Sequence, residues 1–135
     1  MSNFPSDANQ ELRPWLWVAA LNGLGAVIGG IFAVIGSVNP GFQGGSVNTL
    51  VHIYAGAYAV RAVPIAIVLV GLLARPRRTP ALVPLLLVAG LAQGGDAVLG
   101  AIHGQPAMLA GGGAYAVIHL ATALWLSRAS SAKSV

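Results

Sequence analysis

The sequence has no cysteine, and only three of its 135 residues are acidic. Without cysteine the chain can form no disulfide, no thiolate metal site and no cysteine nucleophile, although this absence does not indicate a compartment. Charged residues make up 7% of the chain, whereas a typical soluble domain has about 25%. Hydrophobic residues make up 56%. This composition excludes an ordinary soluble domain and indicates an integral membrane protein.

The basic residues give a formal net charge of +4, but their positions do not suggest a nucleic-acid partner. Only Arg61 lies inside an apolar run. The other six flank the apolar runs: Arg13, Arg75, Arg77, Arg78, Arg128 and Lys133. Basic residues of membrane proteins gather in cytoplasmic segments. We therefore expect a multi-pass protein of the cytoplasmic (inner) membrane, with both termini and the loop at 75–78 in the cytoplasm.

Four apolar runs are long enough to cross a bilayer, which takes about 20 residues of helix. They cover residues 15–37, 49–74, 81–102 and 106–126. The first run is interpreted as a retained span, because it is longer than a signal-peptide core and lacks an A-x-A-like cleavage site. Short connections make sequential helices antiparallel neighbours. The sequence therefore predicts an all-α integral membrane four-helix bundle in up-down-up-down order. The predicted parts are a polar tail at 1–14, the bundle at 15–127 and a C-terminal tail at 128–135.

Asp96 is the only acidic residue within these spans. An ionisable group at membrane depth marks a functional site by default. Arg61 is its expected partner, because helical side chains lean toward the helix N-terminus, which directs Arg61 outward and Asp96 inward. The other polar residues of each span also fall on single helical faces. Because lipid offers such groups no hydrogen-bond partners, we expect the four faces to turn inward around a shared cavity.

The candidate site residues follow from these faces and from the chemistry of their side chains. The predicted catalytic residues are Asp96, Arg61, His119 and Tyr58. The predicted substrate-binding residues are Gln93, Tyr54, Tyr115, Asn22, His52 and His103. Each candidate also has a structural alternative. For Asp96 it is a buried ion pair, and for the two outer histidines it is a position at the membrane interface. For the others it is an interhelical hydrogen bond or ordinary packing. No His-x-x-x-His or His-x-x-Glu spacing occurs within a span, so neither a metal nor another cofactor is expected.

Several short motifs together resemble a known family. The glycine-rich first span ends near Asn39-Pro40, the second contains Ala-Val-Arg-Ala-Val-Pro around Arg61, a basic turn follows, and the third contains Gly-Gly-Asp-Ala-Val-Leu-Gly around Asp96. Over about residues 15–127 this pattern resembles the small four-span membrane proteins of the DoxX-like type. Similar proteins occur in fungal polyketide pathways of the aurovertin type, where they are associated with epoxide opening. Arg61 and Asp96 are the two residues that this resemblance matches by position.

Residues and resemblance together predict a membrane-embedded enzyme that acts on a lipophilic small molecule among membrane lipids. Epoxide hydrolysis or epoxide-opening cyclisation needs a base and a donor for the epoxide oxygen. Asp96, held ionised by Arg61, is the expected base, and Tyr58, Tyr115 or protonated His119 is the expected donor. The alternatives are a small proton-coupled transporter or oligomeric channel, in which Asp96 changes its charge state, and a non-catalytic partner subunit. A transporter of this size would need to form a homodimer to enclose a pathway.

Overall fold

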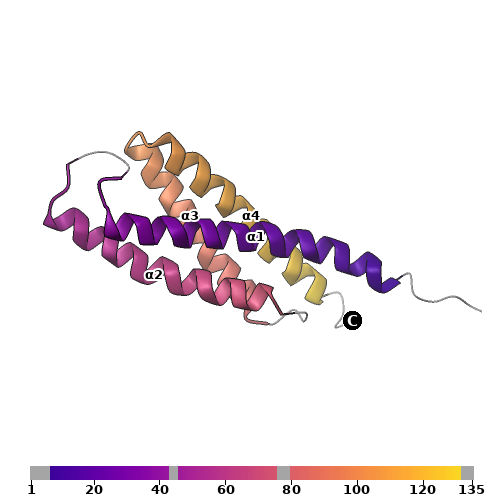
Figure 1. The fold of residues 1–135 in the computed structure, drawn as a ribbon. Helices are drawn as coiled ribbons and strands as arrows, with labels where there is room; N and C mark the ends of the chain where they lie inside the picture. Colours follow the sequence, from indigo (N-terminus) through magenta and orange to yellow (C-terminus); the bar gives the residue numbers. More distant parts are fainter. Residues whose placement is uncertain (1–6, 43–45, 76–79, 132–135) are drawn as a thin grey trace, which may run out of the picture.

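In the part of the chain that the structure describes, four helices form one small bundle (Figure 1). The computed structural model describes residues 7–42, 46–75 and 80–131. The helices are α1 (Asp7–Val38), α2 (Thr49–Leu73), α3 (Leu82–Ile102) and α4 (Pro106–Ser131). Each contains a stretch long and apolar enough to cross a membrane: Pro14–Val38, Thr49–Leu73, Leu82–Ile102 and Pro106–Ala129. The predicted all-α membrane four-helix bundle is confirmed at this level.

The helices at the two ends of the chain extend beyond the predicted spans. α1 begins at Asp7, so the described part of the predicted polar tail is helical and continues through Pro14. α4 likewise continues past Leu126 to Ser131. Each residue added to an existing helix gains a backbone hydrogen bond without a new nucleation step, so a stable apolar span can continue into a polar flank. Residues 1–6 and 132–135 of the two predicted tails lie outside the described residues.

Local sequence signals explain where the inner helix ends fall. Asn48 caps α2, since its side-chain oxygen accepts a hydrogen bond from the backbone N–H of Val51 at 3.0 Å. After α3 the chain turns at Gly104, whose φ of 64° lies in the left-handed region that favours glycine. The N–H of Gln105 then donates to the carbonyl of Gly100 at 2.7 Å, which satisfies a carbonyl in the last turn of α3. This turn lets α4 start at Pro106.

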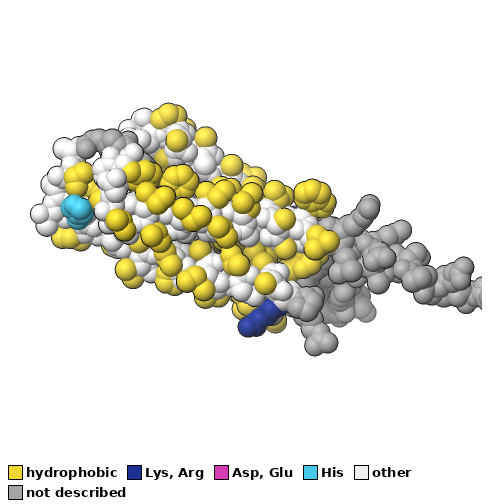
Figure 2. Space-filling model, in the orientation of Figure 1, with side chains coloured by type: hydrophobic (Ala, Val, Ile, Leu, Met, Phe, Trp, Pro, Cys, Tyr) yellow, Lys and Arg dark blue, Asp and Glu magenta, His cyan; other side chains and the backbone are white. Residues whose placement is uncertain are grey.

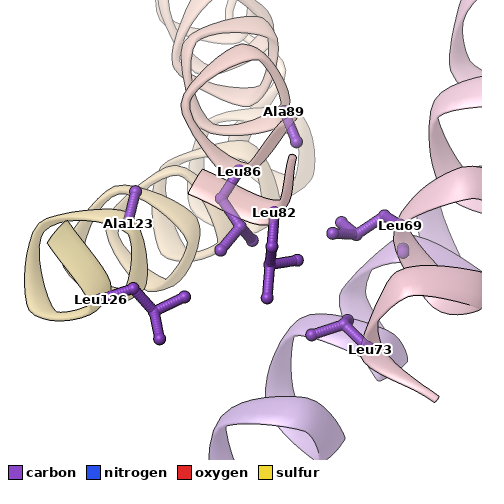
Figure 3. Packing of buried hydrophobic residues seen from close by; sticks show 8 residues of the cluster. Leu69, Leu73, Leu82, Leu86, Ala89, Ala123 and Leu126 are labelled. Atoms are coloured by element: carbon purple, nitrogen blue, oxygen red, sulfur yellow. The ribbon is translucent and has the colours of Figure 1, made fainter. Parts of the chain in front are cut away.

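The four helices pack as two hairpins that meet along a seam. α1 packs mainly against α2 and α3 mainly against α4, while the contacts between the hairpins are fewer. The start of α1 and the end of α4 lie at the same end of the molecule (Figure 1). At that end an apolar cluster joins the hairpins (Figure 3). Its labelled members are Leu69 and Leu73 of α2, Leu82, Leu86 and Ala89 of α3, and Ala123 and Leu126 of α4.

Most of the large apolar side chains outside this cluster face outward. Trp17 is 71% exposed, Ile67 67% and Val117 68%. Hydrophobic side chains are spread along the helices of the face drawn in Figure 2, and a basic side chain appears near one end. Such a surface would be unfavourable in water, whereas lipid tails are as apolar as these side chains. The exposed surface therefore fits the bilayer.

Glycine allows α3 and α4 to approach each other closely. A Cβ atom on Gly112 would lie 2.8 Å from the carbonyl oxygen of Gln93 and 2.9 Å from the backbone nitrogen of Ala97. Both are backbone atoms, which cannot move without shifting a helix. By contrast, a Cβ on the neighbouring Gly111 would have no other atom within 4 Å. Gly112 therefore sets the spacing between these two helices.

Gly112→Ala is expected to destabilise the protein by about 1–3 kcal/mol, because overpacking forces such backbone shifts. The matched control, Gly111→Ala, adds the same methyl group to open space and should leave stability unchanged or slightly raised, since alanine favours helix by about 1 kcal/mol over glycine. Thermal unfolding of both purified variants in the same detergent measures the difference. Identical melting temperatures would contradict the close approach at Gly112.

Candidate active site

A small polar cavity lies between the two hairpins, next to the apolar cluster. Its volume is about 50 Å³, and all four helices contribute to its wall. The polar side chains that line it are Tyr58, Arg61, Gln93, Asp96 and His119. Ala26, Leu69 and Ala89 belong both to the cavity wall and to the apolar cluster, which closes this end of the cavity. Since a cavity needs about 10–15 Å³ of such space to hold one water molecule, this cavity has room for water or a small polar group.

Asp96 contacts Tyr58 across the seam between α2 and α3. The Tyr58 hydroxyl donates a hydrogen bond to Oδ2 of Asp96 at 3.4 Å, which is long for an O–H···O bond, whose usual distance is about 2.7–2.8 Å. Both side chains are half-buried. A base and a proton donor therefore lie side by side at the cavity wall.

Arg61 contacts this pair through the tyrosine ring. Its guanidinium carbon lies 5.6 Å from the centroid of the Tyr58 ring, within the range of a cation–π interaction. Within the described part of the chain no ion pair joins Arg61 to Asp96, so the expected direct partnership is replaced by an arrangement with Tyr58 between them. The reason is helical spacing, because residues three apart are neighbours on one face and Tyr58 therefore lies directly below Arg61.

A second, fully buried network joins α1 to α4. Asn22 is 0% exposed and His119 2% exposed. The Asn22 amide nitrogen donates to the carbonyl of Val18 at 2.8 Å and to Oγ1 of Thr122 at 3.0 Å. The Asn22 amide oxygen lies 2.6 Å from Nδ1 of His119. Each polar group of the Asn22 side chain thus has a buried partner, as interior polar groups require.

This network determines the tautomer of His119. The Val18 carbonyl can only accept, so the amide nitrogen of Asn22 must face it and the amide oxygen must face His119. An amide oxygen only accepts, and therefore Nδ1 of His119 carries a proton. In the neutral ring Nε2 is then the acceptor. Because His119 also lines the cavity, it can offer this acceptor to a bound group.

Tyr115 supports His119 from the same helix without lining the cavity. Its ring centroid lies 6.3 Å from that of His119, with an interplanar angle of 28°. The ring occupies the space over Gly25 of α1, where an added Cβ would overlap it. Glycine is therefore needed at this position of α1 so that Tyr115 can pack there.

The structure brings five predicted site residues into one cavity and leaves others apart from it. All four predicted catalytic residues and Gln93 line the cavity, while Asn22 and Tyr115 contact His119. His52, Tyr54 and His103 are exposed and do not line it, because they lie toward the helix ends away from the apolar cluster. Their predicted role in substrate binding stays a prediction. Thr122 was not among the predicted site residues, although its i+3 spacing from His119 placed both on one helical face.

Among the described residues, no group of three or more His, Cys, Asp or Glu side chains is arranged to hold a metal ion. The fold and the cavity thus define a four-helix integral membrane protein with a polar site between two helical hairpins.

No protein-family model, no curated protein and no solved structure matches the chain. The functional argument therefore rests on the residues of the site.

Proposed function

We propose that this protein is a membrane-embedded enzyme that opens an epoxide in a lipophilic substrate, by hydrolysis or by cyclisation, in a biosynthetic pathway. The observation that carries the proposal is the hydrogen-bonded pair of Asp96 and Tyr58 in a cavity that Arg61 and His119 also line. Epoxide opening needs a base for the attacking hydroxyl and an acid for the departing oxygen. The resemblance to DoxX-like proteins of epoxide-opening pathways supports epoxide opening as the class of reaction.

In the proposed reaction Asp96 acts as the base and Tyr58 as the acid. The Asp96 carboxylate takes a proton from water, or from a hydroxyl of the substrate, as that oxygen attacks an epoxide carbon. The C–O bond breaks, and the epoxide oxygen takes the proton of the Tyr58 hydroxyl. The proton on Asp96 then returns to the Tyr58 phenolate through the contact that joins the two groups. Both residues are restored, and the product is a diol or a cyclic ether.

Arg61 and His119 assist this pair in the proposal. The guanidinium over the Tyr58 ring favours the negative charge that Asp96 carries before it takes the proton and the negative charge that the Tyr58 oxygen carries after it has given up its own. His119, with its proton on Nδ1, can accept a hydrogen bond at Nε2 from the attacking water or hydroxyl. Asn22 is then a positioning residue, since it selects this tautomer.

The direct test offers a panel of amphipathic epoxides to the purified protein in lipid and scores diol or cyclic ether by mass. Formation of either product above the rate without protein supports the proposal. If the protein instead carries protons across sealed liposomes, and turns over no epoxide, the transporter alternative replaces it. The same liposome preparation serves both assays. A homodimer in mild detergent would accompany the transporter alternative, because two copies are needed to enclose a pathway.

We propose further that the helices cross the cytoplasmic membrane in up-down-up-down order, with both termini in the cytoplasm. The basic residues flanking the spans support this orientation, since such residues favour the cytoplasmic side. The position of the α1 start and the α4 end at the same end of the molecule agrees with it.

Reporters fused after Val135 and inserted at the loop of Arg75 are both expected to be cytoplasmic. Paired reporters, one active only in the cytoplasm and one only outside it, measure each position independently. A reporter in the loop after Val38 should give the opposite result and serves as the control. An external C-terminus would overturn the proposed orientation.

A further inference from the structure

The polar cavity is too small to hold a whole lipophilic substrate. Its volume of about 50 Å³ compares with about 300–1,000 Å³ for pockets that enclose small-molecule ligands. On the proposed function, only the reacting epoxide and the attacking oxygen can occupy the cavity. The hydrocarbon part of the substrate must then lie in an adjoining space.

An apolar groove adjoins the cavity on the α1–α2 hairpin. Its volume is about 620 Å³. Along α1 it extends from Ala26 to Ile35, about 14 Å at 1.5 Å per residue. Along α2 it extends from Val63 to Gly71. Every residue that lines it is apolar or glycine, so it can hold hydrocarbon but no polar head group.

Only small residues separate the groove from the cavity. Ala26, Gly30 and Ala66 line both spaces, so one face of these residues borders the polar site and another borders the groove. At the contact between the helices, a Cβ on Gly30 would lie 3.3 Å from the Cβ of Ala66. The wall between the two spaces thus consists of one glycine and two alanines, whose side chains are at most a methyl group. Gly30 and Ala66 are therefore in contact, and the two spaces join only when α1 moves away from α2 by about the width of the group that passes. A slender chain needs a smaller separation than a bulky ring.

We propose that the groove binds the hydrocarbon chain of the substrate, which enters from the lipid and places its epoxide in the cavity between Gly30 and Ala66. This defines the substrate class as an epoxide carried by a slender, unbranched hydrocarbon chain. An apolar space that adjoins a polar one matches such a molecule, which has one polar group and one long apolar part. Because lipid is as apolar as the groove, the groove selects the chain by packing and shape.

Two exposed glycines provide a matched pair of variants. Gly71 lines the end of the groove on α2, and Gly111 lies on α4 and lines neither space. A Cβ at either position would have no other atom within 4 Å. Gly71→Leu therefore fills the far end of the groove without disturbing the packing. Gly111→Leu adds the same side chain to a helix surface elsewhere and controls for effects on folding and insertion.

The experiment uses photo-crosslinking in lipid nanodiscs, with epoxide probes that carry a diazirine at the far end of a long or a short alkyl chain. Labelled residues are mapped by mass spectrometry. Wild-type protein should be labelled by the long probe mainly on the groove residues of α1 and α2. Gly71→Leu should reduce this labelling about tenfold, equivalent to about 1.4 kcal/mol, since the new side chain displaces the end of the long chain. Labelling by the short probe should not change, and Gly111→Leu should behave as the wild type.

Three results would overturn this inference. The first is labelling spread over all four helices in proportion to their exposure. The second is equal labelling by a plain hydrocarbon probe without an epoxide, which would show that the groove holds only bilayer lipid. The third is a change of oligomeric mass in Gly71→Leu together with loss of labelling by both probes, which would show that a second copy covers the groove.

The outcome is independent of turnover, because crosslinking reports binding alone. Groove labelling without turnover of any epoxide would refute the proposed reaction but support the binding site. Turnover of an epoxide by protein that is not labelled in the groove would support the proposed reaction but refute the binding site.

Discussion

Asp96→Asn is expected to lower the rate of epoxide opening by about 10² to 10⁴, the usual contribution of general acid–base catalysis. Asparagine has nearly the shape of aspartate, and its side-chain oxygen can still accept the hydrogen bond from Tyr58. It cannot take a proton from the attacking water. The fold should therefore persist while the reaction loses its base. Rates per folded molecule, with melting temperature measured on the same samples, separate these two effects.

Tyr58→Phe sharpens this test as a companion variant. Phenylalanine retains the ring below Arg61 and removes only the hydroxyl that contacts Asp96. If Tyr58 is the acid, Tyr58→Phe should also lose activity. If Asp96 is purely structural, Asp96→Asn should instead have a lower melting temperature, and its activity should fall only with the folded fraction. Wild-type turnover by Asp96→Asn would exclude Asp96 as the base and remove the main support for an enzyme.

The largest effect on stability is expected for Asn22→Ala. This change leaves Nδ1 of His119 and the hydroxyl of Thr122 without their buried partner. An unsatisfied buried polar group costs about 1–3 kcal/mol, so a loss of about 2–4 kcal/mol is expected. Unfolding of the purified protein in mixed micelles measures the loss.

Ser37→Ala is the matched control for Asn22→Ala. The Ser37 hydroxyl also bonds to a carbonyl of α1, at 2.8 Å, but this bond is exposed to the surroundings, so its removal should change stability by less than about 0.5 kcal/mol. The double variant Asn22→Ala with His119→Leu should be more stable than the sum of its two single changes, because it removes both partners together. Additive losses would show that Asn22 and His119 do not interact.

Several features of the molecule were predictable because they depend on one span at a time. The spans at 49–74 and 81–102 agree closely with α2 and α3, since an apolar run of that length bounded by turn residues has few other structures. The sequence also predicted that Asp96, Arg61, Tyr58, Gln93 and His119 turn inward. All five line one cavity, although Arg61 is exposed. Helical periodicity places polar residues on one face, and their need for hydrogen-bond partners turns that face inward.

The chemistry of the sequence thus determined that this is a four-span membrane protein in which several polar residues of the spans meet between the helices. The tertiary structure alone decided which of those residues touch. Periodicity does not specify how far each helix rotates or how closely it approaches its neighbour, and these depend on contacts such as Gly112 against Ala97 and Tyr115 over Gly25. The rotation and approach of each helix decide that Tyr58 contacts both Arg61 and Asp96 and that Asn22 pairs with His119, because a shift of one helical turn would give each side chain a different partner.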